Sequence, residues 1–110
     1  LVSREKGSGS REALERALLG RGVSPSDLMV VLECTTSEGL REAVAAGIGM
    51  GFVSRLAVSA PAIPRGLKIV RTGPFEIRRD IFLVYQSGKK LSRPAELLAD
   101  ELRAAFRRGG

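Results

Sequence analysis

The chain has 110 residues, of which 44% are hydrophobic and 27% charged, and its formal net charge is +6. This length supports one globular core and is too short for two independent cores. No apolar run reaches the roughly 18 residues of a transmembrane helix, and no segment resembles a signal peptide. We therefore expect a soluble, cytoplasmic protein without membrane contact. The chain starts at Leu1 rather than Met, so we expect a fragment or a processed form of a longer protein.

The composition also argues against several kinds of site. Histidine is absent and Cys34 is the only cysteine, which excludes an internal disulfide and removes the commonest metal ligand and general base. No carboxylate pair is spaced for acid–base work, so we expect no enzyme, no metal and no cofactor. Basic residues are dispersed and aromatic residues make up only 5% of the chain, which disfavours direct nucleic-acid binding. Cys34 is either a small buried residue, which we favour, or a redox sensor.

Hydrophobic periodicity predicts alternating strands and helices in the first third of the chain. A strand at residues 1–4 is followed by a helix from about Arg11 to Arg21, which glycines terminate. Residues 24–27, with Pro25 at a first helical position, predict a capped single turn. The continuous apolar run over residues 28–32 is typical of a strand that is buried on both faces.

A second helix and a third strand are predicted next. Thr35 and Glu38 fit a capping box at the start of a helix. Residues 47–53 carry glycine at every second position, which would weaken a helix but leaves one face of a strand bare. We therefore expect Gly49 and Gly51 to pack closely against a neighbour, so that a β-branched residue at either position would overpack the core.

The second half of the chain is less regular. Residues 54–66 predict a loop with one helical turn, because two prolines lie close together. Residues 67–70 and 80–86 predict further strands, and a last helix begins near Ser92 and Pro94. The apolar face of this helix consists of four residues: Leu98, Leu102, Ala105 and Phe106.

Strands and helices that alternate at this spacing are typical of right-handed crossovers in a parallel sheet, which places the chain in the α/β class. The loops that follow such strands meet at one edge of the sheet, where ligands bind if successive crossovers run in opposite directions. Helix N-termini at this edge favour a small anion or a carboxylate. Five hydroxyl side chains would donate to it: Ser8, Ser10, Thr35, Thr36 and Ser54.

Each of these loops also has a simpler interpretation. Gly7 and Gly9 let the backbone approach a ligand closely, but the same turn is a good helix start with Ser10 as N-cap. Thr35 and Ser54 are in the same way either ligand-binding residues or helix caps. Three basic residues near the loops either steer an anion or only solvate the surface: Arg4, Lys6 and Arg55.

Three stretches of the chain resemble the effector-binding domain of LysR-type transcriptional regulators. They are residues 4–11 with the Gly-Ser-Gly-Ser turn, the polar strand end at residues 33–37, and residues 43–54, which contain the glycine-spaced strand and the Ser54 that follows it. The resemblance covers the whole chain and is closest to regulators of sulfur or carbon assimilation. It implies an α/β, periplasmic-binding-protein-like (type 2) lobe, with a mostly parallel sheet flanked by helices and an antiparallel late strand.

The resemblance also implies an arrangement of parts. Residues 1–91 would be the second lobe of the effector-binding domain, and residues 92–110 a C-terminal helix that returns toward the first lobe. That lobe and a DNA-binding winged helix-turn-helix would precede Leu1, so DNA would be contacted only through the latter. An inducer would bind in the cleft between the lobes, and the second-lobe residues that match by position are Gly7, Ser8, Gly9, Thr35, Thr36, Val53 and Ser54.

Two other classes of protein remain as alternatives. A solute-binding protein of the transport type has the same lobe but carries a secretory leader. An enzyme on this scaffold is disfavoured by the lack of histidine and of paired carboxylates. Because the apolar face of the last helix would lack its natural cover, we also expect self-association, through docking of two such faces or exchange of the helix between copies.

Overall fold

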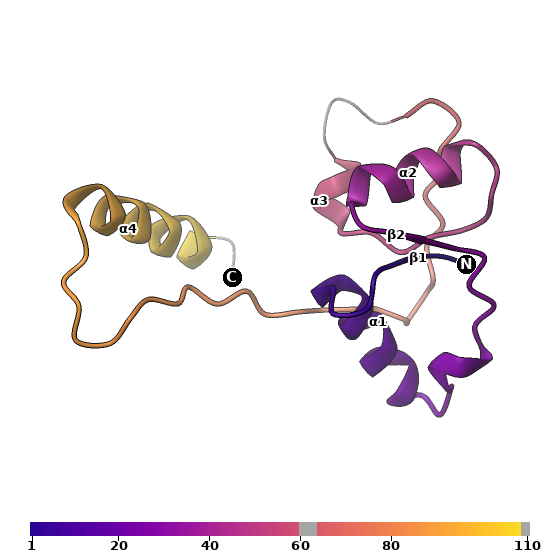
Figure 1. The fold of residues 1–110 in the computed structure, drawn as a ribbon, viewed down its shortest axis with the longest axis horizontal. Coiled ribbons are helices and arrows are strands. Elements are labelled where there is room, and N and C mark those ends of the chain that lie inside the picture. Colours follow the sequence, from indigo (N-terminus) through magenta and orange to yellow (C-terminus); the bar gives the residue numbers. More distant parts are fainter. Residues whose placement is uncertain (60–63, 109–110) are drawn as a thin grey trace. The chain divides into compact units, whose positions relative to one another are not determined.

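The computed structural model describes residues 1–59 and 64–108, so the predicted loop over residues 54–66 lies partly outside the described residues (Figure 1). The chain divides into two compact units, Leu1–Arg79 and Asp80–Gly110. The first unit contains β1 (Val2–Arg4), α1 (Gly9–Leu19), the 3₁₀ turn η1 (Pro25–Asp27), β2 (Leu32–Cys34), α2 (Ser37–Ala45) and α3 (Arg55–Val58). The second unit contains α4 (Arg93–Arg108).

The first unit is built around β1. This strand pairs in parallel with β2, with Val2 opposite Leu32. On its other side Val2 forms an isolated parallel bridge with Gly51, and the Val2 N–H donates to the Met50 carbonyl at 2.7 Å. The two crossovers therefore run in opposite directions, and α1 lies on one side of the strands while α2 and α3 lie on the other (Figure 1). The α/β class and the parallel sheet are confirmed.

The helix starts differ from the predicted ones by one or two residues. α1 begins at Gly9, and its N-cap is Ser8 rather than Ser10, although the Ser8 side chain makes no cap hydrogen bond. α2 is capped by Thr36 rather than Thr35, because the Thr36 Oγ1 accepts from the Gly39 N–H at 2.9 Å. With the helix starting at Ser37, Glu38 is not three residues after the cap, so the predicted capping box does not form. The capped turn at Ser24–Asp27 is confirmed.

A small apolar core lies between β1 and α2. Val2 is fully buried, Leu40 is 2% exposed and Ala43 is 8% exposed. A Cβ on Gly51 would lie 2.5 Å from Leu40 Cδ2 and 3.2 Å from the Val2 carbonyl oxygen, so Gly51 must be glycine for β1 and α2 to approach. At Gly49 a Cβ would meet only ordinary contacts, to the Val2 and Val31 side chains at 3.7 and 3.9 Å, so overpacking by a β-branched residue there stays a prediction.

Several predicted strands are absent from the described residues. The run over residues 28–32 was predicted to be buried on both faces, but the strand starts only at Leu32 and Met29 is 79% exposed. Residues 67–70 and 80–86 form no strand, and apart from the half-buried Leu67 their apolar side chains are exposed, as for Val84 at 83%. A strand needs a backbone partner, and residues 67–70 and 80–86 have no partner strand among the described residues. The predicted antiparallel late strand is therefore not formed there.

A contact that periodicity does not predict fixes part of the chain after α3. The Phe75 ring packs edge-on against Phe52, with centroids 6.3 Å apart, and the Arg21 guanidinium lies 5.2 Å from the Phe75 centroid. Arg21 also donates to the Pro74 carbonyl at 2.7 Å. Residues 74–75 are thereby attached to the end of α1 and to the segment that follows Gly51.

Candidate functional site

The carboxyl ends of β1 and β2 are joined at one edge of the sheet by backbone and side-chain hydrogen bonds. The Glu5 N–H donates to the Cys34 carbonyl at 3.0 Å. The Arg4 side chain reaches across the same edge and donates to the Ser37 Oγ at 3.0 Å and to the Thr35 carbonyl at 3.3 Å. Arg4 therefore connects the end of β1 to the first turn of α2, where two predicted ligand residues lie.

The Arg4 guanidinium also holds the side chain of its neighbour Glu5. Nε donates to one carboxylate oxygen at 2.9 Å and Nη2 to the other at 3.1 Å, which is the bidentate geometry of a strong ion pair. This hydrogen bonding lowers the pKa of Glu5 and raises the pKa of Arg4. The side chains are 18% and 33% exposed, so the pair lies at the surface of the edge.

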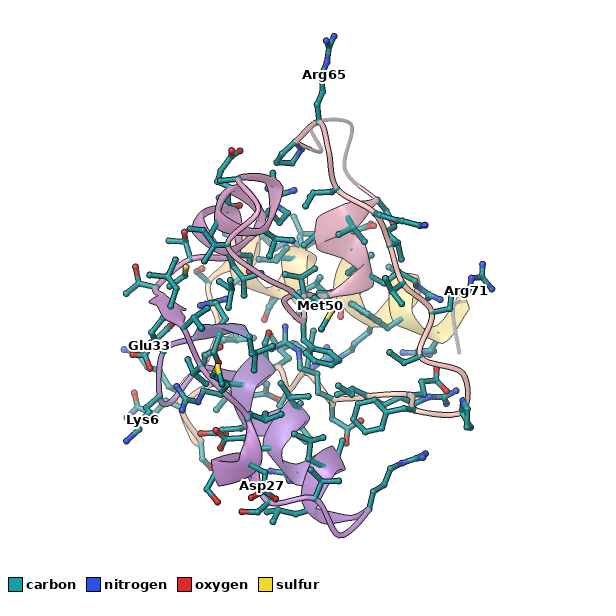
Figure 2. The ribbon with its side chains drawn as sticks, turned by 90° about the vertical axis from the view of Figure 1, so that its right-hand side faces the viewer. Lys6, Asp27, Glu33, Met50, Arg65 and Arg71 are labelled. Carbon is teal, nitrogen blue, oxygen red and sulfur yellow. The ribbon has the colours of Figure 1, made fainter. Side chains whose placement is uncertain are left out.

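A second arginine fixes the end of β1 from the side of α1. Arg11 Nη1 donates to the Arg4 carbonyl at 3.0 Å and to the Glu33 carboxylate at 2.8 Å, while its Nε donates to Glu15 at 2.8 Å. Hydrogen bonding to Glu15, and then to Glu33, raises the pKa of Arg11. Arg11 thus connects α1, β1 and β2. Lys6, by contrast, projects outward (Figure 2).

The Gly-Ser-Gly-Ser turn leads from this edge into α1. Gly7 adopts a φ of +87°, a conformation that glycine adopts without strain, and no atom lies within 4 Å of where its Cβ would be. Ser8 is only 8% exposed and its N–H donates to the Glu5 carbonyl at 3.1 Å, so this residue closes the turn. A Cβ on Gly9 would lie 3.2 Å from Arg79 Nη1, which places a further guanidinium beside the start of α1.

A small hollow lies between β1 and α1. Ser10, Arg11, Leu14 and Phe52 line it together with the three residues of β1. Its volume of about 10 Å³ corresponds to at most one water molecule. The hollow therefore shows that Ser10 faces the sheet, but it is too small to hold an effector.

The remaining predicted site residues divide into two groups. Thr35 and Thr36 are exposed and lie beside Arg4, with Thr36 also serving as the cap of α2. Ser54 is exposed and caps α3, since its Oγ accepts from the Leu56 N–H at 3.3 Å. Val53 packs against the apolar core. The edge therefore brings together the loops after β1 and β2, whereas Ser54 contacts its own helix.

Sequence reasoning missed the two arginines that organise this edge. Arg4 was interpreted only as a charge that steers an anion or solvates the surface, and Arg11 only as the start of the first helix. An arginine at a strand end has no periodic signal, and its partners are far away in sequence. Among the described residues no group of three or more His, Cys, Asp or Glu residues could hold a metal ion, and no described helix is long and apolar enough to span a membrane.

Comparison with known proteins relates this fold to one family. The family described as LysR substrate binding domain matches residues 1–107. The HTH-type transcriptional regulator CbbR of Rhodospirillum rubrum is 34% identical over 106 residues, which are 96% of this chain and 35% of that protein. The HTH-type transcriptional regulator CysL of Bacillus subtilis is 27% identical over 105 residues, or 96% of this chain and 34% of that protein. The chain thus spans about a third of the length of these regulators.

A relative with a different name also matches. The phosphonates import ATP-binding protein PhnC of Anaeromyxobacter dehalogenans is 34% identical over 103 residues, which are 94% of this chain and 21% of that protein. No solved structure matches the chain. The matches to transcriptional regulators confirm the resemblance that the sequence motifs indicate.

Proposed function

We propose a function from the premise that this chain belongs to the family of LysR substrate-binding domains. The chain is the ligand-sensing part of a transcriptional regulator and binds a small anionic effector in a cleft between two lobes, of which it supplies the second. DNA is bound by a winged helix-turn-helix outside this chain, in the cytoplasm. Regulators of this family are not in general enzymes, and the proposed role needs neither catalysis nor a cofactor.

The proposal of an anionic ligand rests on the position of the Arg4 guanidinium at the carboxyl edge of β1 and β2. It lies within hydrogen-bond distance of Ser37 and Thr35 at the start of α2, where the helix dipole adds a positive potential. A ligand placed over this edge meets a guanidinium, hydroxyl groups and free helix N–H groups together. The proposed second-lobe ligand residues are Gly7, Ser8, Gly9, Ser10, Thr35, Thr36, Val53 and Ser54.

Thermal shift measurements at constant ionic strength test this function. The chain is heated with a panel of small carboxylates, sulfate, phosphate and methylphosphonate, and with neutral and cationic compounds of similar size. A ligand that binds only the folded state raises the melting temperature, so we expect stabilisation by one or more anions. Stabilisation by neutral or cationic compounds alone would contradict the proposal.

A transport role is the second candidate, and the similarity to PhnC is the observation that favours it. In that case the chain would be one lobe of a solute-binding component and would not act in transcription. The panel already contains methylphosphonate, and a strong preference for it over carboxylates and sulfate would favour transport. Binding of the full-length protein to its own promoter region, altered by an anion of the panel, would favour regulation.

We also propose that the chain self-associates through α4. The side chains of Leu98, Leu102 and Phe106 are 60%, 37% and 69% exposed, and burial of such a side chain is worth about 1.5–3 kcal/mol. Two copies that dock these faces, or exchange the helix, would bury them.

Light scattering at micromolar concentration is the measurement that tests this association. We expect a dimer or a larger species, and we expect Leu102→Glu to convert it to a monomer. Leu19→Glu, at a side chain of 61% exposure on α1, is the matched control and should leave the association unchanged. A monomeric wild-type chain at high concentration would contradict the role of α4.

A further inference from the structure

Glu5 is placed where a ligand carboxylate would be expected. Its two oxygens accept from Nε and Nη2 of Arg4 at 2.9 and 3.1 Å, so a carboxylate of the protein itself occupies the fork of the guanidinium. Carboxylate, sulfate and phosphate bind an arginine through this same pair of donors. An anionic effector that engages Arg4 in this way must therefore displace Glu5.

The surroundings of the pair make such an exchange feasible. The remaining Arg4 contacts, to the Ser37 Oγ and the Thr35 carbonyl, hold the guanidinium at the sheet edge independently of Glu5. The Glu5 side chain is 33% exposed and is the more exposed partner, so it can swing into water and be solvated there. The guanidinium would stay in place while its anionic partner changes.

We propose that Glu5 is an internal competitor that pairs with the Arg4 guanidinium and is displaced from it by an anionic effector. This inference rests on the proposed function, and it makes Arg4 and Glu5 residues that determine which effector binds. The effector must carry a group that can accept two parallel hydrogen bonds, such as a carboxylate, a sulfate or a phosphate. A halide ion or a neutral hydroxyl compound would not replace the Glu5 carboxylate in this geometry.

The test follows the Arg4 side-chain Nε–H signal by NMR while inorganic sulfate is added at constant ionic strength. The signal is assigned from its loss in Arg4→Lys. In the wild-type chain sulfate should shift this signal, and Glu5→Gln should tighten the sulfate Kd by about two- to fivefold, the range expected for a partly exposed ion pair. Asp100→Asn is the matched control, because it makes the same charge change and frees Arg103, whose Nη1 lies 3.1 Å from Asp100.

The outcomes separate this inference from the proposed function. If sulfate shifts the Thr35–Ser37 amides with the same Kd in the wild-type chain and in Glu5→Gln, or binds more weakly in the variant, Glu5 does not compete and the inference is wrong. Tightening of the same size in Asp100→Asn would also overturn it, because the effect would then be one of net charge. If sulfate shifts no signal at this edge in any of the proteins, while the folded chain is intact, both the inference and the anion site are wrong. Because Glu5→Gln leaves Arg4 and its contacts to α2 unchanged, this variant should stay folded even if Arg4→Lys does not.

Discussion

The two units of the chain carry similar apolar patterns but bury them to different extents. In Leu1–Arg79 the side chains of Val2 and Leu40 are almost completely buried, whereas in Asp80–Gly110 Phe82 and Val84 are 78% and 83% exposed. The difference follows from backbone pairing. β1 has parallel partners on both sides at Val2, while the apolar segment 81–85 pairs with no described strand. An apolar run thus becomes a strand only where another strand satisfies its N–H and C=O groups.

The largest expected effect on stability comes from shortening an apolar side chain in the first unit, compared with a similar change in the second unit. Leu40→Ala should lower the free energy of unfolding by about 2–5 kcal/mol, because it leaves a cavity in the apolar core that Leu40 forms with Val2 and Ala43. Val84→Ala, in the second unit and outside the apolar face of α4, should change it by less than about 0.5 kcal/mol, because this side chain is 83% exposed. Urea denaturation measures both. Equal losses would mean that the second unit buries its apolar face as well as the first does.

The next effect concerns Gly51, which forms an isolated parallel bridge with Val2 beside the two-stranded sheet. Gly51→Ala should cost about 1–3 kcal/mol, because its Cβ would lie 2.5 Å from Leu40 Cδ2 and 3.2 Å from the Val2 carbonyl oxygen, so that the buried Leu40 side chain or the Gly51 backbone would have to shift. Gly49→Ala is the matched control and should stay within about 0.5 kcal/mol, since its Cβ has room. The same denaturation curves apply. If Gly49→Ala is the more damaging change, the close approach is at Gly49 rather than at Gly51, against the structure.

A smaller effect tests the start of α2. Thr36→Ala should cost about 1 kcal/mol, because the Gly39 N–H loses its side-chain acceptor. Thr35→Ala should be nearly neutral, since only the backbone carbonyl of Thr35 is used, by Arg4. Thermal melts of the two variants show whether Thr36, as in the structure, or Thr35, as in the capping box predicted from the sequence, is the N-cap of α2. A larger loss of stability in Thr35→Ala would show that Thr35 caps α2, as the predicted capping box requires.

The smallest effect is the pH dependence of the Arg4–Glu5 pair. The hydrogen bond from Arg4 lowers the pKa of Glu5 below its ordinary value of 4.5. The pair therefore stabilises the folded chain fully above about pH 4.5, and this contribution is lost as the pH falls through the lowered pKa. A carbon-13 NMR titration of the Glu5 carboxyl group should show a lower pKa in the wild-type chain than in Arg4→Met, where only the smaller effect of a backbone hydrogen bond remains. Identical titration curves would mean that the pair does not form in solution.

Much of the fold could be predicted from local signals. Glycine after α1, the Ser24 and Pro25 turn, and the alternation of strands and helices each depend on neighbours in sequence, and each is found close to its predicted place. The strands at residues 67–70 and 80–86 could not be judged in this way, because strand formation depends on a partner that is remote in sequence. Hydrophobic periodicity indicates that a segment has an apolar face, but it does not indicate whether another part of the chain packs against that face.

The candidate site shows the same limit. The loops at Gly7–Ser10 and Thr35–Thr36 were predicted from their residue types, and the structure places the ends of β1 and β2 side by side. The contact that joins these ends comes from Arg4, whose partner Ser37 is 33 positions away. No sequence spacing indicates such a bond. The site therefore depends on a long-range side-chain contact that becomes visible only once the register of β1 against β2 is known.

Mapping sulfate binding on the backbone amides of the folded chain by NMR tests the central claim most directly. The account predicts that the amide signals that move with added sulfate cluster at Gly7–Ser10 and at Thr35–Gly39, on the two loops joined by Arg4. Perturbations confined to the exposed arginines of residues 65–79 or of α4, with those two loops unmoved, would contradict an anion site at the carboxyl edge of β1 and β2.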